Sequence, residues 1–174
     1  NKLFGVGGGG LMTIGQMTEI AVLGLIPVFA KKVSRRSLLA VGLIAYAARM
    51  ALFAYVDAIP LPTIATLILG VAMHGLCFGC FIFVAFLIVD EETTGDVRAS
   101  AQSLFNLVIV GIGIIVGSMI STGLGEWATT VDEAGNSVTN YRQLFSVPMW
   151  ASLGCLVVLL FLYPSRSKSA EAAQ

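Results

Sequence analysis

The chain has 174 residues, of which 57% are hydrophobic and only 11% are charged, and its mean hydropathy is +0.90. In a soluble domain roughly a quarter of the residues are charged, and a soluble fold of this length could not bury so much apolar surface. Ten basic residues balance ten acidic ones, so there is no basic field to attract nucleic acid. The composition excludes an ordinary soluble enzyme, a nucleic-acid-binding protein and a disordered chain, and it predicts an integral membrane protein.

The apolar residues gather in five long runs that are separated by short polar connectors. Each run reaches the ~20 residues that a helix needs to cross ~30 Å of hydrocarbon. Strands of a membrane β-barrel are about half as long and alternate polar with apolar residues, so unbroken runs indicate helices. The sequence therefore predicts an all-α, polytopic transmembrane helix bundle. The predicted spans are residues 3–30, 37–59, 63–89, 99–124 and 144–163.

Lys and Arg residues are unevenly divided between the two sides of these spans. Because membrane proteins keep basic residues in their cytoplasmic loops, connectors 31–36 and 90–98 and the tail 165–174 are expected in the cytoplasm. Connector 125–143 is expected outside, as a solvated loop with a turn. The expected location is the bacterial inner (plasma) membrane, with a cytoplasmic C-terminus. The basic residues on the cytoplasmic side are Lys31, Lys32, Arg35, Arg36, Arg98, Arg166 and Lys168.

The beginning of the chain suggests a piece of a longer protein. It opens Asn-Lys without an initiator methionine and without the pattern of a signal peptide. The odd number of predicted spans strengthens this expectation. We expect residues 1–164 to be the transmembrane part of such a piece.

Three ionisable residues lie deep in different predicted spans. Glu19, Arg49 and His74 each lie about 16–18 Å from a helix end at 1.5 Å per residue. Ionisable groups in the bilayer are costly, so each is a candidate functional residue. Because the three groups lie at the same depth, the acid, the base and the imidazole can neutralise one another or carry a proton. A purely structural Glu–Arg pair and a histidine bonded to a backbone carbonyl are the alternatives.

Two neighbours complete this candidate site. Gln16 lies three residues before Glu19 on the same helical face, and Phe78 lies one turn after His74. Gln16 and Glu19 can bind the hydroxyl or amide groups of a polar solute, and Phe78 can stack on a ring. Ordinary packing is the alternative for Phe78.

Several short motifs are weaker signals. Gly5-x-Gly7-x-x-Gly10 matches a dinucleotide fingerprint but has no preceding strand, and Cys77-x-x-Cys80 lies within a span rather than in a thioredoxin-like context. We therefore expect no cofactor and no metal site. A membrane redox enzyme that uses the two thiols is the alternative. Small-residue pairs that predict closely packed helix faces are Gly75-x-x-x-Gly79 and Gly113-x-x-x-Gly117.

The two predicted cytoplasmic connectors carry opposite charges. Arg35 and Arg36 lie in the first. Arg98 lies in the second, where it faces the acids Asp90, Glu91, Glu92 and Asp96. A charge network between them could latch an inward-facing gate. Simple anchoring of the basic connector in the cytoplasm is the alternative.

The residues also carry a family resemblance. Gln16-Met-Thr-Glu19, Ala48-Arg49, His74-Gly75 and the stretch 98–102 resemble the second half of the nucleoside:proton symporters of the major facilitator superfamily. The resemblance implies that the spans are helices eight to twelve of a twelve-helix transporter with a midplane cavity, and that the N-terminal half is a missing partner. It also implies that Gln16, Glu19 and Phe78 contact the nucleoside. His74 replaces a family Tyr, and Gly79 replaces a family acid.

The predicted function is a proton-coupled nucleoside symporter, seen as its C-terminal part, and not an enzyme. A proton-coupled sugar or oligosaccharide symporter and a non-transporting membrane subunit are the alternatives. The expected partners are a polar small molecule (nucleoside or sugar), a proton, the missing N-terminal half and the lipid bilayer. The predicted substrate-binding residues are Gln16, Glu19, His74 and Phe78, and the predicted proton-coupling residues are Glu19, Arg49 and His74.

Overall fold

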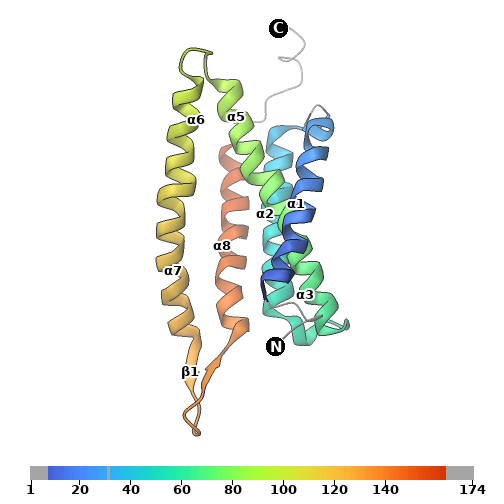
Figure 1. Cartoon of the computed structure of the whole chain (residues 1–174), viewed down its shortest axis with the longest axis vertical. Coiled ribbons are helices and arrows are strands. Elements are labelled where there is room, and N and C mark those ends of the chain that lie inside the picture. Colours follow the sequence, from blue (N-terminus) through green and yellow to red (C-terminus); the bar gives the residue numbers. More distant parts are fainter. Residues whose placement is uncertain (1–7, 31, 164–174) are drawn as a thin grey trace.

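The computed structural model describes residues 8–30 and 32–163, and most of them form helices that run alternately up and down (Figure 1). Residues 3–7 of the first predicted span, Lys31 and the tail 165–174 lie outside the described residues, and so do Gly5 and Gly7 of the glycine motif. Within the described part, four helical stretches are long and apolar enough to cross a membrane, which confirms the predicted helical bundle. These stretches are Arg35–Ala54, Thr63–Glu92, Arg98–Ala128 and Tyr141–Leu162.

Helix α1 (Gly8–Ala30) packs against the stretch Thr63–Glu92, and its apolar part, Met12–Val28, is shorter than the four stretches. Helix α2 (Arg35–Ala54) begins two residues before the predicted span, because Oγ of Ser34 accepts a hydrogen bond from the backbone N–H of Ser37 and so caps the helix. It also ends earlier, and a short 3₁₀ helix η1 (Val56–Ala58) follows.

The third span is one bent stretch built from four helical segments. It runs through α3 (Thr63–Ala72), α4 (His74–Cys77), the π-helical η2 (Phe78–Phe83) and α5 (Val84–Glu92). The sequence predicts its position but not the π-helical turn, which inserts extra backbone and changes the face that later side chains present. The change begins at Phe78, one turn after His74, in the middle of the span.

The fourth span contains α6 (Arg98–Asn106), the π-helical η3 (Leu107–Ile112) and α7 (Gly113–Ala128), and it continues four residues beyond its predicted end. Figure 1 shows it at one side of the bundle, with α8 (Tyr141–Leu162) between it and α2. Its side chains are largely exposed apolar groups, such as Met119 and Ile115.

A β-hairpin joins α7 to α8, where the sequence predicts only a loop with a turn. Strands β1 (Thr129–Val131) and β2 (Ser137–Thr139) pair antiparallel, with Thr129 opposite Thr139. The predicted turn is present: Gly135 has φ +82°, a conformation that favours glycine. The β-branched residues on both sides of the turn explain the strands. We call this end of the bundle the hairpin end, and the opposite end, with residues 32–36 and 90–98, the basic end.

Helix α2 is the centre of the bundle and packs against α8 and the third span. Val84 is fully buried against Leu38 and Leu39 of α2, near the basic end. Backbones also approach closely there: a Cβ on Gly42 would lie 2.9 Å from the backbone nitrogen of Phe81. This close contact fixes the third span against α2. It therefore determines where the side chains of both elements lie in the bundle interior.

Glycines on the third span allow an equally close contact with α1. A Cβ on Gly75 would lie 2.5 Å from the carbonyl carbon and oxygen of Thr18, and one on Gly79 would lie 2.7 Å from Cγ1 of Val22. This confirms the packed face predicted for Gly75-x-x-x-Gly79. The prediction for the second glycine pair is not met within the described residues, because a Cβ on Gly117 would meet nothing within 4 Å.

We predict that Gly75→Ala lowers the melting temperature of the protein in detergent. The new methyl group would collide with backbone atoms of α1, which cannot rotate away, and overpacking of this kind costs about 1–3 kcal/mol. Gly117→Ala is the matched control, since its methyl group enters open space. Equal melting temperatures for the two variants would contradict the close α1–α4 contact.

The hairpin turn contains a carboxylate, Asp132, whose hydrogen bonds to the turn depend on pH. The backbone N–H of Asn136 donates to Oδ1 of Asp132 over 2.8 Å, and this bond is the main cause that holds the pKa of the Asp132 carboxyl below its ordinary value. The pKa of Asp132 is lower in the folded protein than in the unfolded chain. The carboxylate therefore stabilises the turn at a pH above the unfolded-state pKa. This stabilisation is lost as the pH falls through the folded-state pKa.

An NMR titration of the Asn136 amide should therefore show a midpoint below about 3.9, the ordinary aspartate pKa. Asp132→Asn should abolish the transition, because the amide side chain does not titrate in this range. A midpoint at or above the ordinary aspartate value would refute the turn geometry.

Candidate functional site

Glu19, Arg49 and His74 meet inside the bundle, as their predicted equal depth indicates. Oε2 of Glu19 lies 3.8 Å from Nε2 of His74, and Nη1 of Arg49 lies 3.1 Å from Nδ1 of His74. The three side chains come from α1, α2 and α4. The Gly75 contact is the local cause, because it presses α4 against α1 beside Glu19.

The side chains of Glu19 and His74 are only partly buried, so both can be reached from outside the bundle. The side chain of Glu19 is 23% exposed and that of His74 is 36% exposed. Partial burial makes charge interactions between them stronger than in bulk water, while a solute could still reach both groups. This combination suits a binding site better than a sealed structural ion pair.

Arg49 contacts the histidine, not the acid. Within the described residues it forms its hydrogen bond to His74 and no ion pair with Glu19. Its guanidinium carbon also lies 5.5 Å from the ring centroid of Phe53, at cation–π distance, while its Nε atom is buried without a hydrogen-bond partner. His74 therefore lies between Arg49 and Glu19 and contacts both, in place of the expected direct Glu19–Arg49 pair.

The other predicted binding residues lie around this chain. The ring of Phe78, at the start of η2, lies 6.3 Å from the His74 ring at an interplanar angle of 49°. Gln16 is exposed and lies one turn before Glu19 on α1. The thiols of Cys77 and Cys80 are free and buried, so the redox alternative gains no support from a disulfide.

Charged residues at the basic end form a second cluster. Arg35, at the start of α2, makes two contacts with the carboxylate of Glu91 in α5, one of them from Nε to Oε2 over 3.1 Å. Arg36 donates to the backbone carbonyl of Leu160 near the end of α8. The predicted link between the two connectors is present, and it ties α2 to α5 and α8.

Asp90 and Arg98 form a second ion pair, within one connector. Asp90 faces its own connector, where its Oδ1 lies 3.4 Å from Nε of Arg98 and accepts a hydrogen bond from Gln102 over 3.0 Å. One step along a helix turns a side chain by about 100°, so neighbouring acids at positions 90 and 91 point to different partners. The sequence shows that acids cluster here but not which one faces Arg35.

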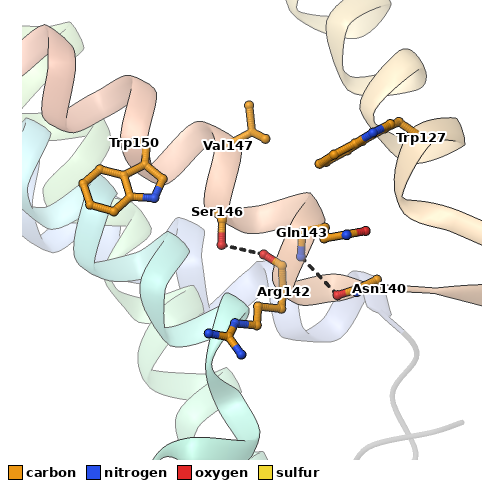
Figure 2. Close-up of a pocket in the computed structure, with 7 residues that line it drawn as sticks. All are labelled: Trp127, Asn140, Arg142, Gln143, Ser146, Val147 and Trp150. Atoms are coloured by element: carbon orange, nitrogen blue, oxygen red, sulfur yellow. Dashed lines mark hydrogen bonds between the residues drawn. The ribbon is translucent and has the colours of Figure 1, made fainter.

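Two open cavities lie at the hairpin end, away from these clusters. The larger, about 580 Å³, is drawn in Figure 2, which shows Trp127 of α7 across from side chains of α8. Arg142 lies 4.9 Å from the ring centroid of Tyr55 and also borders the second cavity, of about 360 Å³. Exposed tryptophans and an arginine near a helix end are typical of the membrane–water interface. The larger cavity is lined by Trp127, Asn140, Arg142, Gln143, Ser146, Val147 and Trp150.

Comparison with known proteins decides the family. The family described as "Nucleoside H+ symporter" matches residues 3–168, nearly the whole chain. The chain belongs to the nucleoside H+ symporter family. This confirms the family resemblance seen in the sequence and identifies the chain as an integral membrane protein.

Individual relatives agree with this assignment. Nucleoside permease NupG of Escherichia coli (strain K12) is 28% identical over 158 residues, which are 91% of this chain and 35% of that protein. Xanthosine permease of the same strain is 30% identical over 129 residues, which are 68% of this chain and 30% of that protein. A crystal structure of the nucleoside transporter NupG matches with a TM-score of 0.75 at 26% identity, over 88% of this chain and 37% of that chain. The chain thus spans about a third of the length of these relatives.

We predict that Arg35→Glu lowers the melting temperature, because it places two carboxylates opposite each other, and that adding Glu91→Arg restores it. The pair is partly exposed, so the recovery should correspond to about 0.2–1 kcal/mol. The matched control combines Arg35→Glu with Asp90→Arg, which should restore nothing. Recovery in the control instead would show that Asp90 is the partner of Arg35.

Proposed function

We propose that the chain is the C-terminal part of a proton-coupled nucleoside symporter. Family membership and the nucleoside relatives support this proposal, and one structural observation carries it. Glu19 lies eleven residues from each end of α1, with its carboxylate 3.8 Å from the imidazole of His74. An acid at mid-span beside a titratable partner is the arrangement expected of a proton-binding site in a transporter.

Coupling follows from the cost of burying a charge. While the site is open, water reaches Glu19 and its ionised form is tolerated. When the transporter closes around a solute, the charged carboxylate loses this water, and binding a proton removes the cost. Nucleoside and proton then move together, because closure is favourable only when both are bound.

The proposed binding site uses groups of different chemistry around Glu19. Gln16 and Glu19 would hydrogen-bond the hydroxyl groups of the sugar, His74 would add a further polar contact, and the exposed ring of Phe78 would stack on the base. These side chains line one part of the site, and the N-terminal half of the transporter would supply the rest. The exposed apolar side chains of α6 and α7 would then contact that half or lipid.

We further propose that the basic end faces the cytoplasm of a bacterial cell, and that its charge network belongs to a cytoplasmic gate. The excess of Lys and Arg there supports the orientation. The contacts of Arg35 with Glu91 and of Arg36 with Leu160 support the gate, because they join three helices at one end of the bundle. Asp90 and Arg98 would brace the second connector of this gate.

We predict that Glu19→Gln in the complete encoded protein reduces proton-driven uptake of labelled nucleoside to the level of cells that lack the protein. The amide resembles a protonated carboxyl but cannot release a proton, so exchange of internal for external nucleoside should persist. Glu126→Gln, which changes an exposed acid of α7, is the matched control and should keep full uptake.

Full proton-driven uptake in the Glu19→Gln variant would refute the role of Glu19. Uptake of labelled sugar in place of nucleoside by the unaltered protein would show that the sugar symporter alternative is correct. Transport of neither solute by protein of normal surface expression would favour the non-transporting subunit.

A further inference from the structure

The bond between Arg49 and His74 fixes which histidine nitrogen carries the hydrogen. A guanidinium group only donates hydrogen bonds, so Nδ1 of His74, which lies 3.1 Å from Nη1 of Arg49, must be the acceptor. An accepting Nδ1 bears no hydrogen, and the imidazole is then neutral with its hydrogen on Nε2. A doubly protonated imidazole would have to break the bond to Arg49.

The nitrogen that keeps its hydrogen is the one that faces the acid. Nε2 of His74 lies 3.8 Å from Oε2 of Glu19, about 0.9 Å beyond an ordinary hydrogen bond, so a small side-chain rotation brings donor and acceptor together. Glu19 thus faces an N–H donor, which suits an ionised carboxylate. The charged and titratable groups that face His74 from the packed elements are Glu19 of α1 and Arg49 of α2, with Cys77 one turn along its own element.

Arg49 is itself held in place by packing. Its guanidinium lies over the ring of Phe53, whose centroid is 5.3 Å from that of Phe145 in α8. Gly70 of α3 lies against the same ring, since a Cβ there would be 2.4 Å from Cε1 of Phe53. The arginine therefore has a defined position from which to orient the imidazole.

We infer that Arg49 is a positioning residue that holds His74 in the neutral tautomer with hydrogen on Nε2, so that Glu19 faces a donor. The arrangement distinguishes the two states of the acid. Ionised Glu19 accepts from Nε2–H and stays beside His74. Protonated Glu19 can accept only through its uncharged carboxyl oxygen, which weakens the bond to Nε2–H, and its own O–H becomes available to donate to the solute. This coupling step rests on the proposed function, whereas the tautomer does not.

Nitrogen NMR of protein labelled with ¹⁵N-histidine tests the inference directly. His74 is the only histidine of this chain, and a His74→Gln sample identifies its signals within the complete protein. At a pH above the ordinary histidine pKa of about 6.5, where the imidazole is neutral, we expect a single tautomer with an unprotonated Nδ1 and a protonated Nε2. A hydrogen on Nδ1, or a mixture of tautomers, in the unaltered protein would overturn the inference.

Variants of Arg49 separate positioning from bulk packing. Lysine is also only a donor, so Arg49→Lys should keep the single Nε2–H signature. Glutamine can accept as well as donate, so Arg49→Gln should give a mixture that includes hydrogen on Nδ1 or the doubly protonated ring. An unmixed Nε2–H spectrum in Arg49→Gln would show that Arg49 does not select the tautomer.

Uptake assays on the same variants distinguish failure of the inference from failure of the proposed function. Arg49→Lys should retain proton-driven nucleoside uptake and Arg49→Gln should lose it, while both exchange nucleoside across the membrane. If the unaltered protein shows the expected tautomer but transports no nucleoside, the function is wrong and the tautomer stands. If it transports nucleoside with hydrogen on Nδ1, the inference alone is wrong.

Discussion

The candidate site depends on one close contact between two helices. Gly75 lets the backbone of α4 touch α1 at Thr18, where any larger side chain would collide with main-chain atoms. This contact places Glu19 beside His74, and the packing of α2 against the third span brings Arg49 to the other side of the same imidazole. In a membrane, where apolar surfaces gain little by meeting one another, such close backbone packing and polar contacts hold helices together.

The polar chain that results explains how an acid is tolerated at mid-span. His74 is a neutral intermediary between a cation and an acid, so the guanidinium acts on Glu19 through the imidazole and not by a direct ion pair. A direct pair would hold the carboxylate ionised in every state of the transporter. Under the proposed function, an intermediary lets the acid exchange a proton, as symport requires.

The sequence predicted the helical spans because apolar runs and their length follow directly from the thickness of the bilayer. It also predicted that Glu19, Arg49 and His74 lie at one depth, since the helical rise converts residue number into depth. It could not predict which of them touch, because the π-helical turns and the rotation of each helix are set by packing. The same limit explains why the sequence did not show which acid faces Arg35, and why the short strands at residues 129–139 were missed.

A pH electrode in a weakly buffered suspension of vesicles that contain the complete protein tests the central claim most directly. Nucleoside added to de-energised vesicles should make the medium more alkaline as protons enter with the solute, and a proton-conducting uncoupler should abolish the signal. Entry of labelled nucleoside without any proton movement would contradict the account, whatever the arrangement of Glu19 and His74.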